Sequence, residues 1–154
     1  MEFPRSWVFS DVKATIFEKS SFSIFFIAAT FLFSSEGVEK AFSDIYQNRV
    51  WGVLPSGEGS SGEGSDYQNA LDYLNFLKQF IESHHIHSIV DIGCGDWELF
   101  KQLDLSNVEY WGFDVVKSVI ERNQRLYKAP NIHFIYADAV DIALPEADLL
   151  ICKD

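Results

Sequence analysis

The chain has 154 residues, enough for one domain, and its 12 Lys and Arg against 23 Asp and Glu give a net charge of −11. That acidic balance argues against a protein that holds nucleic acid by neutralising phosphates. Hydrophobic residues make up 47% of the chain, which excludes wholesale disorder. The two cysteines, Cys94 and Cys152, are too few for a disulfide framework and fit a reducing compartment, so the composition favours a cytoplasmic protein.

Residues 1–35 form an N-terminal extension with an almost wholly apolar centre, Phe22–Phe33. Twelve helical residues rise about 18 Å, short of the roughly 30 Å hydrocarbon core of a bilayer, so an ordinary transmembrane helix is not predicted. The length suits the apolar centre of a signal peptide, and Lys13 and Lys19 precede it, although acidic residues in the leader argue against a signal. The segment is therefore either signal-like and membrane-associating, or a buried part of the fold.

Residues 36–65 are expected to form a leader helix followed by a loop rich in Gly and Ser. Apolar and aromatic residues within Glu39–Trp51 recur at helical spacing. Residues 56–65 then repeat SGEGS twice, and four glycines in ten residues are typical of a loop without regular structure. Composition alone favours a flexible linker here, and the alternative is a mobile loop that lies over a ligand.

Helical and strand patterns alternate from Asp66 to the end of the chain. Asp66 is the expected N-cap of a helix that reaches about Ser83. Further helices are expected at 97–103 and 116–127, and strands at 88–92, 109–113, 132–136 and 148–152. Strands that alternate with helices indicate an α/β fold, a doubly wound parallel sheet of the Rossmann-like class, here over residues 66–154.

Three histidines, His84, His85 and His87, stand close together before the first of these strands. They have no Cys or carboxylate partner at a recognisable ligand spacing. A solvated turn is therefore favoured, and no metal site is predicted.

The strongest chemical signal is the first strand of this region and the turn after it, where Asp91, Gly93, Cys94 and Gly95 follow one another as D-x-G-C-G. A buried strand that ends in G-x-G lets the backbone approach a ligand where a Cβ atom would collide. The turn is expected to run into a helix, whose N-terminal N–H groups then face that ligand and favour an anionic part of it.

Two further carboxylates follow the next two strands. Asp114 ends the second strand and is placed to accept hydrogen bonds from the hydroxyls of a ribose, while Asp138 follows the third strand. Both stand at carboxyl ends of strands, the edge where open α/β sheets bind ligands. Each has a structural alternative, since Asp114 could cap the helix near Val116 and Asp138 could turn the chain.

At this point the sequence resembles a family. Asp91-x-Gly93-x-Gly95, Asp114 and Asp138-Ala139 look like the first three cofactor motifs of class I S-adenosylmethionine-dependent methyltransferases, and residues 148–154 are similar to the fourth. The resemblance implies methyl transfer from S-adenosylmethionine to an unidentified acceptor, and the net charge of −11 favours a small molecule or a protein over a nucleic acid. One departure is Trp97, which replaces a third glycine that the first motif sometimes carries.

The resemblance also implies a role for each matched residue. Asp91 and the backbone of Gly93, Cys94 and Gly95 would face the amino-acid part of the cofactor. Asp114 would hold the ribose, Val115 the adenine ring, and Asp138 with Ala139 the edge of the adenine. Lys153 would lie near the methyl-transfer site, and Asp154 is the one acid placed where a catalytic base could stand.

Two other functions remain open from the sequence. The chain could be a non-catalytic remnant that binds cofactor or self-associates. It could also belong to a nicotinamide-dependent enzyme, but the dinucleotide motif G-x-G-x-x-G would need its third glycine at Glu98, where an acid would crowd the packing and repel phosphate.

The resemblance implies a sheet of about seven strands, and the chain stops at the fourth. The methyltransferase domain is therefore expected to be incomplete at its C-terminus. The strand at 148–152 is then expected to be an open, apolar edge through which chains could associate.

Overall fold

A computed structural model describes residues 14–18 and 35–153 and contains five strands and three α-helices in that part of the chain. The strands are β1 (Ala14–Glu18), β2 (Ser88–Ile92), β3 (Glu109–Asp114), β4 (Ile132–Tyr136) and β5 (Leu149–Lys153). The α-helices are α1 (Ser35–Gln47), α2 (Leu71–Ser83) and α3 (Lys117–Leu126). Short 3-10 helices, η1 (Glu63–Ser65) and η2 (Phe100–Gln102), complete the elements.

The five strands form one sheet in the order β1-β5-β2-β3-β4. Strands β5, β2, β3 and β4 are mutually parallel, α2 precedes β2, and α3 connects β3 to β4, which confirms the predicted Rossmann-like α/β class. Side chains of Ile89 and Val90 point to opposite faces of β2, and each is at most 1% exposed. The central strand is thus buried on both faces, as its continuous apolar sequence predicted.

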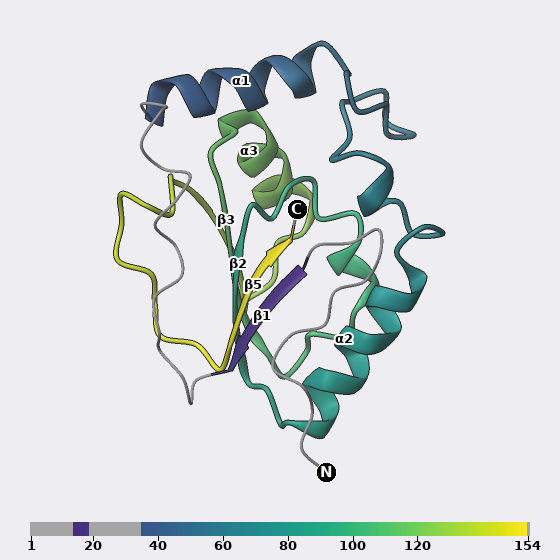
Figure 1. Cartoon of the computed structure of the whole chain (residues 1–154), viewed down its shortest axis with the longest axis vertical. Helices are drawn as coiled ribbons and strands as arrows, with labels where there is room; N and C mark the ends of the chain where they lie inside the picture. The colour runs from purple at the N-terminus through teal and green to yellow at the C-terminus, as the bar shows by residue number, and fades with distance from the viewer. Residues whose placement is uncertain (1–13, 19–34, 154) are drawn as a thin grey trace.

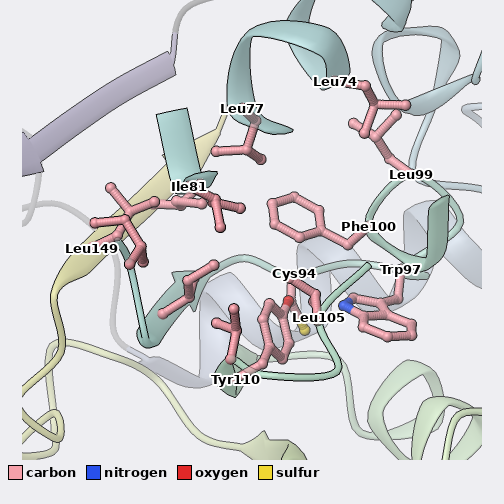
Figure 2. Packing of buried hydrophobic residues seen from close by; sticks show 14 of the residues in the cluster. Leu74, Leu77, Ile81, Cys94, Trp97, Leu99, Phe100, Leu105, Tyr110 and Leu149 are labelled. Carbon is pink, nitrogen blue, oxygen red and sulfur yellow. The ribbon is translucent and has the colours of Figure 1, made fainter. Parts of the chain in front are cut away.

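One hydrophobic core lies between the sheet and the helices α2, η2 and α3 (Figure 2). The helical side supplies Leu74, Leu77, Ile81, Phe100 and Ile120, and the strands supply Ile89, Tyr110, Phe134, Leu149 and Ile151. Side chains alternate between the two faces of a strand, so these strand residues share one face of the sheet. Because α2 and α3 both contribute residues to this core, the two helices pack on that same face. Helix α1 lies apart from this core, at the end of the sheet toward which β5 points (Figure 1).

The prediction that the fourth parallel strand is an open edge is wrong. Residues 14–18, where no strand was predicted, form β1 and pair antiparallel with β5, with Ile16 opposite Ile151. Strand β5 therefore lies between β1 and β2, and the edge proposed for self-association is covered. Strand β4 lies at the other edge, where the side-chain amide of Gln124 donates a hydrogen bond of 2.8 Å to the Phe134 carbonyl oxygen. Such a contact partly satisfies the edge of a sheet.

Two predicted helix boundaries also differ from the structure. Helix α2 begins at Leu71 with Ala70 at its N-cap, and Asp66 instead accepts the backbone N–H of Gln68 within a preceding turn. The leader helix begins at Ser35, before the predicted Glu39. Helix ends depend on capping contacts that periodicity does not specify.

Among the described residues, no helix has the length and apolar character needed to cross a bilayer. The apolar segment Phe22–Phe33 lies outside the described residues, as does Asp154. The expected signal-like role of the former and the catalytic role of the latter remain predictions.

Candidate functional site

The glycine turn after β2 has backbone conformations that require glycine. Gly93 and Gly95 have φ values of 72° and 55°, in the left-handed region that other residues rarely adopt. A Cβ atom on Gly93 would meet no atom within 4 Å, whereas one on Gly95 would stand 2.3 Å from the Ser61 Oγ atom. Gly93 thus faces open space, and Gly95 is packed against the loop of residues 56–65.

The predicted helix at 97–103 is absent, and η2 of three residues replaces it. Trp97 has a φ of 58°, and the Asp96 Oδ1 atom accepts the backbone N–H of Glu98, which together turn the chain away from a helical path. Trp97 itself is buried in the core against the rings of Tyr110 and Phe134 (Figure 2). The expected helix N-terminus behind the turn therefore does not exist, and a bulky ring fills the place of the third glycine.

The N–H groups of the glycine turn are bonded within the protein instead. Those of Gly93 and Cys94 donate to the Phe113 carbonyl oxygen at 2.8 and 3.0 Å. That of Gly95 donates to the Asp114 Oδ2 atom at 3.0 Å. The turn is thus held by the carboxyl end of β3, the neighbouring strand.

Asp91 lies directly before this turn, inside the protein. It is 2% exposed, and its Oδ2 atom accepts a hydrogen bond of 2.6 Å from the hydroxyl of Tyr110 on β3. Burial raises the pKa of Asp91 to about 7, against the opposing effects of the Tyr110 hydrogen bond and the positive charge of Lys153. A cationic ligand group beside Asp91 would favour its ionised form.

Asp114 ends β3 and is 9% exposed. Its Oδ1 atom accepts the Val116 N–H at 2.8 Å and its Oδ2 atom the Gly95 N–H, so it holds the turn that leads into α3, whose N-cap is Val116, and also joins the glycine turn. Burial raises the pKa of Asp114, and these backbone hydrogen bonds oppose that rise. Each carboxylate oxygen retains a second lone pair, with which it could accept a ligand hydroxyl.

The remaining predicted cofactor residues lie at the same ends of the strands. The backbone N–H of Ala137 donates to the Asp114 carbonyl oxygen, which places Asp138 and Ala139 beside the end of β3. The Asp138 carboxylate accepts the Val140 N–H, the turn role that was its structural alternative. Val115 packs against a small buried cluster that contains Tyr46 of α1.

Lys153 and Asp91 line one cavity of about 40 Å³ together with the glycine turn and Ser61. A carboxylate and an ammonium group in one cavity suit a zwitterionic group such as the amino-acid end of a ligand. Burial raises the pKa of the Cys94 thiol well above its ordinary value, so this cysteine stays protonated. Within the described residues, no group of three His, Cys, Asp or Glu side chains could hold a metal ion.

The structure also brings to the site residues that the sequence analysis missed, chiefly Ser61, Asp96 and Arg122. The Ser61 N–H donates to the Asp96 carboxylate at 2.7 Å, and the Asp96 N–H donates to the Ser61 hydroxyl at 2.9 Å. Arg122 forms an ion pair of 2.6 Å with Glu58 of the same loop. Residues 56–65 are thus docked on the site, and the interpretation of this segment as a free linker is wrong. No local pattern signals these contacts, since their partners lie 35 and 64 residues apart.

No family model and no curated protein matches the chain. Solved structures with a similar course of the backbone include the plantazolicin methyltransferase BpumL, with a TM-score of 0.45 and 20% identity, covering 71% of this chain and 38% of that one. The N-methyltransferase NodS from Bradyrhizobium japonicum has a TM-score of 0.41 and 19% identity, over 51% of this chain and 40% of that one.

A putative caffeoyl-CoA O-methyltransferase from Staphylococcus aureus has a TM-score of 0.41 and 16% identity, over 71% of this chain and 46% of that one. The structures of BpumL and NodS contain S-adenosylhomocysteine. The chain spans less than half the length of each of these proteins. By its own topology it has a Rossmann-like parallel α/β fold, and these solved structures that it resembles are methyltransferases.

Proposed function

We propose that the chain is the cofactor-binding part of an S-adenosylmethionine-dependent methyltransferase. The observation that carries the proposal is the meeting of three groups at the carboxyl ends of β2 and β3. Asp91 precedes the glycine turn, and Asp114 bonds to the turn through the Gly95 N–H at 3.0 Å. A nucleoside with an amino-acid tail needs such a combination: hydroxyl acceptors, opposite charges and a backbone without Cβ atoms.

The residues fit the two ends of this cofactor in different ways. Asp91 and Lys153 would hold the ammonium and carboxylate of its amino-acid end, and Asp114 would hold the ribose hydroxyls. The cavity of about 40 Å³ is smaller than the roughly 300–1,000 Å³ of sites that enclose a whole ligand, so it suits one end only. When bound, the cofactor supplies a methyl group activated by its sulfonium. We keep a small molecule or a protein as the acceptor and the cytoplasm as the location, on the grounds of the acidic charge and of a cysteine count too low for a disulfide framework.

The position of Glu98 favours this cofactor over a dinucleotide. Glu98 accepts hydrogen bonds from Arg122 and from Tyr127 at 3.0 and 2.7 Å, and so fills the position at which a dinucleotide motif needs its third glycine. Its carboxylate would also repel a pyrophosphate.

The test is a thermal-shift measurement on the full chain with S-adenosylhomocysteine, S-adenosylmethionine and NAD. The first two ligands are expected to raise the melting temperature by several degrees, because a ligand that binds only the folded state stabilises it. Asp114→Ala is expected to abolish the shift, and Asp114→Asn, which keeps the shape of the side chain, to reduce it.

Asp104→Ala is the matched control, because Asp104 is exposed and accepts the N–H of the residue two positions later, as Asp114 does. It is expected to keep the full shift. No shift with either ligand in folded wild-type protein, or a larger shift with NAD, would contradict the proposal. Binding without transfer to any offered acceptor would instead favour a non-catalytic cofactor-binding chain.

A further inference from the structure

Six hydrogen bonds from three other parts of the chain hold the backbone of the turn Gly93–Asp96. The N–H groups of Gly93, Cys94 and Gly95 are held by β3, as described above. The carbonyl oxygens of Gly95 and Asp96 accept hydrogen bonds of 2.7 and 3.0 Å from Asn123 and Arg122, which lie next to each other on α3. The remaining N–H group, that of Asp96, bonds neither to β3 nor to α3.

That partner is Ser61, in the docked loop of residues 56–65. Its hydroxyl accepts the Asp96 N–H at 2.9 Å and shares a second hydrogen bond, of 2.7 Å, with the hydroxyl of Tyr46 on α1. Its own N–H returns a hydrogen bond to the Asp96 carboxylate. Asp96 is only 3% exposed, so water does not readily replace these contacts.

The same loop is fixed at a second point. The guanidinium group of Arg122 bonds to Glu58 in the loop, to Glu98 after the turn and to the Asp96 carbonyl oxygen. The Arg122 side chain is 8% exposed and that of Glu58 is 46% exposed, so the ion pair joins a buried guanidinium group to a carboxylate that water still reaches. Two separate contacts, of Ser61 with Asp96 and of Glu58 with Arg122, therefore fix the position of the loop relative to the turn.

We infer that Ser61 is a positioning residue, which holds the glycine turn in the conformation that receives the cofactor, so that residues 56–65 form one wall of the cofactor site. The inference rests on the proposed function for its ligand. Because the turn is already ordered before the ligand binds, no binding free energy is lost in ordering it, and the affinity is higher. Loss of the Ser61 hydroxyl leaves a buried N–H without its acceptor and loosens the turn in the free protein.

Ser60 provides a matched control in the neighbouring position. Its hydroxyl donates to the Trp51 carbonyl oxygen at 2.8 Å and accepts the Gly62 N–H at 3.3 Å, so both contacts stay inside residues 35–65. Ser60→Ala therefore removes a hydroxyl from the same loop without touching the turn.

The first measurement is amide hydrogen exchange of the full chain without ligand. In Ser61→Ala the amides of Gly95 and Asp96 are expected to exchange about threefold to tenfold faster than in wild type, the range expected for one lost hydrogen bond. In Ser60→Ala they are expected to stay within about twofold, and Ser61→Thr, which keeps the hydroxyl, is expected to restore protection. Unchanged exchange in Ser61→Ala, or equal acceleration in Ser60→Ala, would overturn the inference.

The second measurement is calorimetric titration with S-adenosylhomocysteine. Ser61→Ala is expected to weaken binding about threefold to tenfold and Ser60→Ala by less than about twofold. Tighter binding by Ser61→Ala would overturn the inference, because it would mean that Ser61 competes with the ligand for the Asp96 N–H. A wild-type chain that binds no S-adenosylhomocysteine would refute the proposed function, and the exchange measurement would still decide whether Ser61 holds the turn.

Discussion

The hydroxyl of Tyr110 donates a hydrogen bond of 2.6 Å to the carboxylate of Asp91, from β3 to the neighbouring β2, and neither residue is more than 2% exposed. The buried carboxyl group of Asp91 is removed from water but keeps one strong hydrogen-bond donor, the Tyr110 hydroxyl. Because burial raises the pKa of Asp91 to about 7, its charge changes near neutral pH. The pair therefore links the folding and the ligand affinity of this chain to pH.

The contribution of Asp91 to stability should fall as the pH rises from about 4 to about 7. The ordinary pKa of Asp91 is 3.8, so in this interval the folded chain binds a proton that the unfolded chain has lost, and ionisation at higher pH penalises the folded state. The full shift of the Asp91 pKa, from 3.8 to about 7, corresponds to about 4 kcal/mol of unfolding free energy at most. Urea unfolding of wild type and Asp91→Asn at several pH values measures it. The difference between the two free energies of unfolding is expected to shrink or reverse as pH rises, and a constant difference would contradict the assigned pKa.

Tyr110→Phe should destabilise the protein more at pH 8 than at pH 5. The Tyr110 hydrogen bond stabilises the ionised form of Asp91, so its removal raises the pKa of Asp91 further and leaves a buried carboxylate without its donor at high pH. A loss of about 1–3 kcal/mol is expected at pH 8, and a smaller one at pH 5, where Asp91 is protonated. Tyr136→Phe, at an exposed tyrosine, is the control and should change little. Equal losses at both pH values would argue against the pairing.

Arg122→Gln should lower the free energy of unfolding by about 2 kcal/mol. The substitution leaves two carboxylates, Glu58 and Glu98, without their shared cation, but their side chains are 46% and 23% exposed, so water compensates in part. Lys117→Gln removes one member of an exposed pair with Glu121 on the same helix and should cost less than about 0.5 kcal/mol. Urea unfolding of both variants measures the contrast, and similar losses would mean that Arg122 contributes no more than a surface charge.

Gly95→Ala should destabilise the chain more than Gly93→Ala. Both positions have positive φ, which costs an alanine roughly 1 kcal/mol, but only the new Cβ at position 95 would collide with the Ser61 Oγ atom. The excess should shrink in the double variant Ser61→Ala/Gly95→Ala, because the colliding oxygen is gone. Thermal unfolding of wild type, Ser61→Ala, Gly95→Ala and the double variant completes a double-mutant cycle, and strict additivity would contradict the close packing of the loop on the turn.

Much of the fold could be predicted from the sequence because local patterns determine it. The apolar runs before Asp91, Asp114 and Asp138 define three of the parallel strands, and the structure places β4 at the predicted residues. The glycines at 93 and 95 require a tight turn wherever the chain goes next. Because parallel strands have their carboxyl ends at the same edge of the sheet, the glycine turn and the carboxylates that follow these strands lie together at that edge.

Helical composition does not produce a helix where side chains compete with the backbone. The segment 97–103 has helical composition, but Asp96 accepts the Glu98 N–H and Trp97 adopts a left-handed conformation to reach the core. Burial of a large ring outweighs the weak preference of a few residues for a helix.

The contacts between distant segments depend on the folded chain. Pairing of β1 with β5, and the docking of Ser61 on Asp96 and of Glu58 on Arg122, join parts of the chain that no local pattern relates. The repeated SGEGS sequence has the composition of a linker, and it becomes a wall of the site because buried donors and acceptors of the turn need partners. The four parallel strands, the glycine turn and the carboxylates at the strand ends follow from local sequence patterns, whereas the groups that hold that turn in place follow from the folded chain, since hydrogen-bond partners are set by proximity in space.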